Sequence, residues 1–120
     1  MTEMPKQANI ADLPNLQDLP DHTMRRFSGQ NVMIQVATSP AGSSFEAHSH
    51  HNEQLVYVLE GRIRLHLGDD STGITTYELA KGDLLAVPPH MPYSGETLED
   101  TVALDAFTPP RTSVMGESEE

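Results

Sequence analysis

The sequence predicts an all-β domain in which short antiparallel strands form two facing sheets. Short runs of β-favouring residues recur along the chain at regular spacing, and Gly and Pro mark the turns between them. Residues 62–67 alternate polar and apolar side chains, as a strand with one buried face does. No window shows the apolar periodicity of an amphipathic helix. These observations leave a sandwich, a barrel and a jelly roll open.

Residues 1–29 are expected to form an extended N-terminal arm. They contain Pro5, Pro14 and Pro20 and have no sustained periodicity. Apolar side chains need a surface to cover, so the arm is expected to lie over the barrel or over a partner subunit. The apolar residues spaced along it are Ile10, Leu13, Leu16 and Leu19.

Residues 30–110 are predicted to form the barrel. Proline lacks the backbone donor that a central strand needs, so Pro88-Pro89 ends the sixth predicted strand and Pro109-Pro110 follows the last one. Residues 111–120 end in Gly-Glu-Ser-Glu-Glu and are expected to form an acidic, solvated tail. The predicted strands cover residues 31–38, 44–50, 54–59, 62–67, 75–79, 84–87 and 101–107.

The composition excludes several classes of partner. The 120-residue chain has room for one domain, and its 18 acidic and 7 basic residues give a formal net charge of −11. Such a charge disfavours nucleic acid and anionic membrane surfaces, and no apolar run is long enough to span a bilayer. The absence of cysteine removes disulfides and thiolate ligands. Because the N-terminus lacks the basic start and apolar stretch of a signal peptide, a cytoplasmic location is expected.

A pair of histidines, His48 and His50, is the first candidate for a metal site. Residues two apart on a strand share a face, so both imidazoles can point into the barrel. Imidazole nitrogens bind Zn, Fe, Mn, Ni and Cu ions. Gln54, on the next predicted strand, can add an amide oxygen. The pattern therefore predicts one divalent metal ion of this group.

Asp105 is the second candidate, because it is a charged residue within an apolar predicted strand. Burying a charge is unfavourable unless the charge is paired or functional. Period two puts Asp105 on one face with Ala103 and Phe107. If that face lines the barrel, Asp105 can act as a general base or acid, and Arg111 can hold a substrate carboxylate with its guanidinium fork. The alternative is a structural ion pair between Asp105 and Arg111.

The spacing around the histidines resembles the first sequence motif of the cupin family. That motif is a Gly, five residues, His-x-His, three or four residues, an acidic or amide ligand, six residues and a Gly. Residues 82–88 are similar to the second cupin motif, which runs from a Gly to a Pro. The resemblance covers about residues 30–108 and implies a double-stranded β-helix, the jelly-roll barrel of cupins. The first motif reads here Gly42, His48, His50, Gln54 and Gly61.

One position departs from the cupin pattern. The second motif implies a metal-binding His five residues after its Pro, and Tyr93 occupies that position here. Three arrangements are open: Tyr93 binds the metal as a phenol or phenolate, His90 reaches it from the preceding loop, or water takes the fourth position. We favour Tyr93 over His90 because Tyr93 stands at the ligand position of the motif.

The end of the chain, together with Gln54, resembles the small cupins of pectin and alginate breakdown, which ketonise unsaturated monouronates. This resemblance implies metal binding by the His-x-His pair, the glutamine and the ligand position of the second motif. For the substrate, it implies Asp105 as the proton carrier, Arg111 as the group that holds the uronate carboxylate and Phe107 as a substrate-facing aromatic.

The leading hypothesis is therefore a metal-dependent enzyme that acts on a small carboxylated sugar or a related keto-enol substrate. A non-catalytic cupin that binds a small molecule is the alternative from another class. Related cupins of the same outline are dioxygenases or polyketide cyclases, which is a third possibility. A homodimer is expected, because small cupins usually pair and because residues 10–19 of the arm need a surface to cover.

Overall fold

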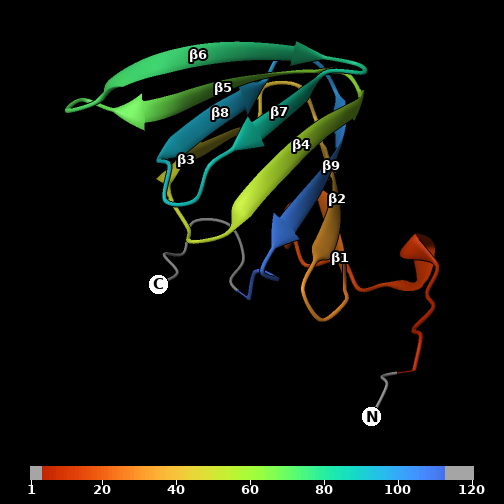
Figure 1. Ribbon diagram of the computed structural model, residues 1–120. Coiled ribbons are helices and arrows are strands. Elements are labelled where there is room, and N and C mark those ends of the chain that lie inside the picture. Colours follow the sequence, from red (N-terminus) through yellow and green to blue (C-terminus); the bar gives the residue numbers. More distant parts are fainter. Residues whose placement is uncertain (1–3, 113–120) are drawn as a thin grey trace.

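The computed structural model describes residues 4–112 (Figure 1). Within this range the chain forms nine β-strands, and its only helical element is one short 3-10 helix. The expected all-β fold is confirmed. In chain order the elements are η1 (Ile10–Asp12), β1 (Thr23–Ser28), β2 (Met33–Ser39), β3 (Ser44–His48), β4 (Glu53–Glu60), β5 (Arg62–Asp69), β6 (Gly73–Ala80), β7 (Leu84–Val87), β8 (Tyr93–Thr97) and β9 (Thr101–Thr108).

Two antiparallel sheets face each other, as the strand pattern predicts (Figure 1). The five-stranded sheet has the order β1-β2-β9-β4-β7, and the four-stranded sheet has the order β3-β8-β5-β6. Apolar side chains from both sheets meet between them and form the main core. The buried members of that core are Val56, Val58, Leu65, Leu67, Leu79, Val87 and Tyr93.

The alternation of a strand places polar residues on the inner face of the five-stranded sheet. On β9, Ala103, Asp105 and Phe107 are buried, as predicted, and the residues between them are half-buried. On β4, Gln54 is buried while both of its neighbours are exposed. Because Gln54 pairs with Phe107 in the β4–β9 ladder, Gln54 and Asp105 lie side by side on this inner face.

The structure has two strands that the sequence pattern does not indicate. β1 lies inside residues 1–29, where an extended arm is expected, and it pairs with β2 along its whole length. β8 follows the two prolines, and the Ser-Gly-Glu at the centre of its sequence Tyr-Ser-Gly-Glu-Thr has little β-favouring character. Its Gly95 is needed for packing, because a Cβ atom there would lie 2.8 Å from the Arg64 carbonyl oxygen on β5. β3 ends at His48, so His50 lies in the loop before β4.

The described residues of the arm before β1 pack against β1. The Asn15 side-chain oxygen accepts a hydrogen bond from the Met24 N–H (2.9 Å), and the Leu16 N–H donates to the Met24 carbonyl (2.8 Å). Arg25 Nε donates to the Leu13 carbonyl (3.0 Å). The arm is therefore attached to its own barrel along one edge of the five-stranded sheet.

No helix within residues 4–112 has the length and apolar character needed to cross a bilayer. Of the predicted acidic tail, residues 113–120 lie outside the described residues.

Candidate metal centre and ligand pocket

Backbone carbonyls orient both histidines of the His-x-His pair. His48 Nδ1 lies 3.2 Å from the Glu46 carbonyl, and His50 Nδ1 lies 3.1 Å from the Asn52 carbonyl. Carbonyl oxygens only accept, so each Nδ1 carries a proton and each Nε2 has a free lone pair in the neutral ring. The ring centroids lie 6.1 Å apart. This is how proteins orient imidazoles that bind a metal through Nε2.

Gln54 and Tyr93 complete the cluster around the two rings. The Tyr93 hydroxyl donates to Gln54 Oε1 (2.9 Å), and His50 Nε2 lies 3.2 Å from the same oxygen. Tyr93 pairs with His48 across the β3–β8 ladder, and their ring centroids are 4.5 Å apart. His90 has an exposed side chain, and its contact with His50 is made by its backbone N–H. The structure therefore brings Tyr93, and not the His90 side chain, to the two histidines.

The charge states of these residues fit a metal ion. Burial lowers the pKa of His48 and of His50, and the nearby Arg111 charge lowers both further, so the two rings are neutral near pH 7. His48 Nε2 is buried and has no hydrogen-bond partner within the described residues. The lone pair of His50 Nε2 faces Gln54 Oε1, also an acceptor. Two ligand atoms that each lie about 2.1 Å from the same metal ion are about 3 Å apart. This is close to the 3.2 Å between His50 Nε2 and Gln54 Oε1.

The donor set is less anionic than that of most metal sites. Within residues 4–112, no three His, Cys, Asp or Glu side chains are grouped so that they can hold a metal. The cluster offers two imidazoles, one amide oxygen and one phenol. Burial and the charge of Asp105 raise the pKa of Tyr93, so its hydroxyl is protonated in the metal-free protein. The residues therefore fit a divalent ion.

Asp105 lies beside this cluster and is held by two glutamine amides. Gln54 Nε2 donates to its Oδ1 (3.1 Å), and Gln35 Nε2 donates to its Oδ2 (3.1 Å). Burial raises the pKa of Asp105 to about 6, although the two amides and the charge of Arg111 favour the ionised form. Both carboxylate oxygens are thus engaged by amides, and Arg111 acts on Asp105 through its nearby charge.

We expect the raised pKa of Asp105 to appear in the pH dependence of stability of the metal-free protein. The folded state holds this proton up to about pH 6, whereas the unfolded chain releases it near pH 4. Ionising the buried group therefore lowers the free energy of unfolding as pH rises from 4 to 6, by about 3 kcal/mol. Denaturant unfolding of the wild type and Asp105→Asn at each pH isolates this effect as their difference. Parallel pH profiles for the two proteins would show that the pKa is not raised.

Arg111 and Phe107 form the next part of the site. Arg111 is buried, and its guanidinium carbon lies 5.7 Å from the centroid of the Phe107 ring. That ring also makes an edge contact with His50, with centroids 5.7 Å apart. The fully buried Asn52 donates from its side chain to the Pro109 carbonyl, which ties the histidine loop to the segment after β9. The structure therefore brings the predicted substrate residues next to the predicted metal ligands.

Gln35 and Arg26 belong to the same network, and neither is among the residues predicted from the sequence. Arg26 Nε donates to Gln35 Oε1 (2.8 Å) on the neighbouring strand. Gln35 is 6% exposed and stands between apolar residues of β2. A polar residue at an inward position of an apolar strand is the same signal that singles out Asp105, and it was available for Gln35 as well.

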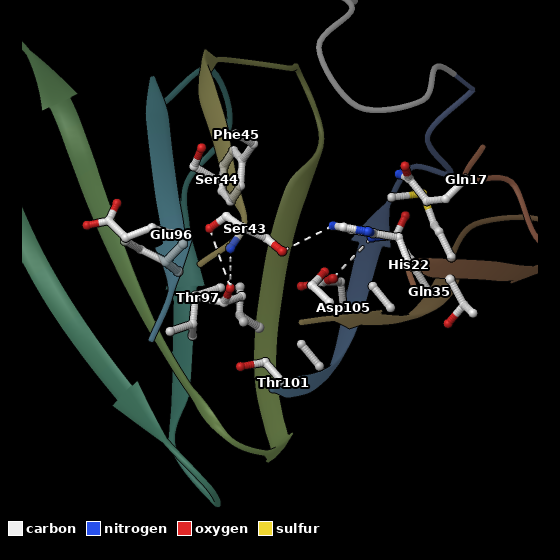
Figure 2. A pocket seen from close by; sticks show the side chains of 18 of the residues that line it. Gln17, His22, Gln35, Ser43, Ser44, Phe45, Glu96, Thr97, Thr101 and Asp105 are labelled. Atoms are coloured by element: carbon white, nitrogen blue, oxygen red, sulfur yellow. Dashed lines mark hydrogen bonds between the residues drawn. The ribbon is translucent and has the colours of Figure 1, made fainter. Parts of the chain in front are cut away.

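The cluster lies at the wall of a pocket between the two sheets. The cavity has a volume of about 140 Å³, close to that of a cavity which holds benzene. Gln35, Asp105 and Phe45 are among the side chains that line it, and His22 lines it from the end of the arm (Figure 2). His22 Nε2 lies 3.1 Å from Ser43 Oγ, and this contact links the start of β1 to the segment before β3 (Figure 2).

Comparisons with known proteins agree with this architecture. The cupin domain family model matches residues 35–107. An uncharacterized protein of Methanocaldococcus jannaschii is 30% identical over 73 residues, which are 60% of this chain and 54% of that protein. The chain thus spans about half the length of this relative.

Three solved structures show the same fold. KdgF from Halomonas sp. has a TM-score of 0.76 at 20% identity, over 90% of this chain and 96% of that one. An RmlC-like cupin from Shewanella frigidimarina has a TM-score of 0.73 at 20% identity, over 92% and 96%. Oxalate decarboxylase of Bacillus subtilis, which has Mn(II) centres, has a TM-score of 0.78 at 20% identity, over 92% of this chain and 32% of that one.

Proposed function

This chain belongs to the cupin domain family, and from this premise we propose that it binds one divalent metal ion and acts on a small carboxylated sugar or keto-enol substrate. The metal is Zn, Fe, Mn, Ni or Cu, held by His48, His50 and Gln54, with Tyr93 at the remaining position. The observation that carries the proposal is a pair of imidazole lone pairs to which no described group donates a hydrogen bond. Within the described residues His48 Nε2 is buried without a partner, and His50 Nε2 faces the Gln54 amide oxygen, which accepts from the Tyr93 hydroxyl.

The neighbouring residues support a proton transfer on a carboxylated ligand. A bound divalent ion would polarise oxygen atoms of the ligand. Arg111 is the cation beside the cluster, and its fork suits a carboxylate. Phe107 offers a flat apolar surface next to it. Asp105, with a pKa of about 6, can give a proton to a carbon and take one from an enol oxygen. The two transfers together convert an enol to a ketone without a net change in protons.

The direct test of this function is turnover of an unsaturated monouronate, followed by NMR as the enol signals give way to those of the keto product. We expect conversion by metal-loaded protein that greatly exceeds the spontaneous rate. Ligand binding without conversion would favour the second candidate, a non-catalytic binding cupin. One observation supports that candidate: both oxygens of Asp105 already accept hydrogen bonds in the free protein.

Replacing Tyr93 should change metal affinity in opposite directions for two variants. Tyr93→His exchanges a protonated phenol for a neutral imidazole, and we expect metal to bind about tenfold more tightly. Tyr93→Phe should lower affinity only slightly, because water can take the position. Competition titrations with a chromogenic chelator measure both. A loss of a hundredfold or more in Tyr93→Phe would instead identify a phenolate ligand.

We propose further that two copies of the chain pair through the outer face of the five-stranded sheet. Cross-strand pairing aligns two rows of mostly apolar residues on this face, and only one residue in them is charged although the chain carries −11. These rows form the centre of the face and contain no acidic residue, whereas Glu53 and Glu60 lie at the two ends of β4, so the centre is where two such chains repel least. Exposed side chains in the rows include Leu84 (67%) and Leu55 (48%). The rows are Phe27, Ile34, Ala106, Leu55 and Ala86, and Arg25, Val36, Leu104, Tyr57 and Leu84.

The described residues of the arm contact this outer face at its β1 end. Lys6 Nζ lies 5.9 Å from the centroid of the Phe27 ring, and Arg25 contacts Leu13. We therefore expect the wild type to be a dimer by light scattering at micromolar concentration, and the Leu55→Lys, Leu84→Lys double variant to be a monomer. Ile74→Lys should stay dimeric, because Ile74 lies on the other sheet and its exposure of 54% falls between those of Leu55 and Leu84. A wild-type monomer would contradict the proposal that this surface forms a dimer interface.

We also propose a cytoplasmic location for the protein.

A further inference from the structure

We propose that Arg26, Gln35 and Asp105 are positioning residues that hold the side-chain amide of Gln54 with its oxygen toward the metal centre. The inference rests on the metal site proposed above and concerns how the protein presents one of its ligands. A glutamine amide has an oxygen that binds cations and an NH₂ group that does not. If the amide turns over, the ligand is lost even though the side chain has not moved. Something must therefore fix its direction.

The direction is set from the far end of the network. An arginine only donates hydrogen bonds, so the atom of Gln35 that faces Arg26 Nε at 2.8 Å must be the amide oxygen. Gln35 Nε2 then faces Asp105, and a carboxylate accepts from it at 3.1 Å. The other carboxylate oxygen accepts from Gln54 Nε2 at 3.1 Å. Gln54 Oε1 is left facing His50 and Tyr93. An ionised Asp105 accepts on both oxygens, so every contact is satisfied only when both glutamines turn their NH₂ groups toward it.

Burial prevents the side-chain amides from turning over. Gln35, Asp105 and Gln54 are 6%, 7% and 4% exposed, so bulk water cannot replace a lost partner. A turned amide would place NH₂ against NH₂ or oxygen against oxygen inside the barrel, which is costly in a buried network. The three strands that carry these residues, β2, β9 and β4, are adjacent in one sheet, and Gln35 pairs directly with Asp105. The backbone therefore fixes their spacing.

The network also explains why an amide stands where the cupin motif usually has a glutamate. A glutamate at position 54 would put a second carboxylate about 3 Å from Asp105, where like charges repel. The amide supplies a donor to Asp105 and an acceptor to the metal. Gln54 and Asp105 therefore form a matched pair of hydrogen-bond donor and acceptor. The amide and the carboxylate can be swapped between the two positions.

Exchange of the pair is the sharpest test, with Co²⁺ binding as the readout. Asp105→Asn should weaken Co²⁺ binding about 10- to 100-fold, because the introduced asparagine gives its oxygen to the pinned Gln35 amide and turns its NH₂ toward Gln54. Gln54→Glu alone should also weaken binding or lower the melting temperature. The Gln54→Glu, Asp105→Asn double variant restores donor facing acceptor, so it should bind Co²⁺ at least as tightly as the wild type. Failure of the double variant to recover affinity over both single variants would overturn the proposal.

Gln35→Leu tests the outer part of the network without touching a metal ligand. We expect Co²⁺ affinity to fall about tenfold and the visible Co²⁺ spectrum to change. Thr97→Val is the matched control, because Thr97 is a buried polar residue of the same pocket whose hydroxyl, within the described residues, is hydrogen-bonded to Ser43 and Pro40 and not to the network. It should bind Co²⁺ like the wild type. Equal affinities for Gln35→Leu, Thr97→Val and the wild type would contradict a positioning role.

A metal-free measurement separates this proposal from the metal site itself. In NMR spectra of the apo protein, the Gln54 side-chain NH₂ protons should be slow to exchange with solvent, and Gln35→Leu should speed their exchange and shift their resonances. If the wild type binds no metal but this response occurs, the network stands and the proposed function fails. If metal binds and Gln35→Leu does not change the Gln54 resonances, the proposed positioning role of the network is wrong and the proposed metal site stands.

Discussion

Asp105→Asn is expected to lower the rate of monouronate ketonisation by about 10²- to 10⁴-fold, the usual contribution of a general acid or base. Asparagine has nearly the same shape as aspartate but cannot carry a proton between a carbon and an enol oxygen. The melting temperature at neutral pH should change little, because two effects oppose each other. The variant removes a buried charge, which stabilises the folded state, and it mismatches one amide contact, which destabilises it.

The measurement is the single-turnover rate at saturating metal, with the metal content of each sample determined in parallel. Asp70→Asn is the control, since Asp70 is an exposed turn residue, and it should keep the wild-type rate. A variant at position 105 that loses several kcal/mol of stability and retains its rate would show that Asp105 is a structural residue.

His48→Ala and His50→Ala should each lower metal affinity by more than about 100-fold. Loss of a residue behind a ligand already costs 10- to 100-fold, and these variants remove the ligand itself. His90→Asn is the control, because Asn tolerates the positive φ of 65° at this position. It should bind metal like the wild type, since the His90 side chain is exposed. Strong loss of metal in His90→Asn would instead identify the loop histidine as a ligand.

The sequence predicts much of the fold because strand alternation and turn residues are local signals. Residues 101–107 show this most clearly: the face predicted for Asp105 and Phe107 is the buried face of β9. β8 could not be predicted in this way, because Gly95 and its polar neighbours lack β propensity. That strand forms because Gly95 lets it pack closely between β3 and β5, which is a tertiary requirement.

Only the part of the candidate site that depends on short intervals in the sequence could be predicted. His48 and His50 are two apart, and Gln54 follows at a motif interval, so one stretch of sequence carries all three. The hydrogen bond between Asp105 and Gln35 could not be predicted from such intervals. Gln35 is 70 residues away from it in the chain, and only the β2–β9 register brings the two together. The sequence leaves open a structural ion pair of Asp105 with Arg111; in the structure its two carboxylate oxygens accept from the Gln35 and Gln54 amides.

The most direct test of the metal centre is an anomalous difference map from a crystal soaked in Zn²⁺ or Mn²⁺ and recorded at the absorption edge of that metal. We expect one strong peak per chain within bonding distance of His48 Nε2 and His50 Nε2, with the Gln54 side-chain oxygen as a third ligand. A map with no peak between the two histidines, from protein that is fully folded and loaded with excess metal, would contradict the account.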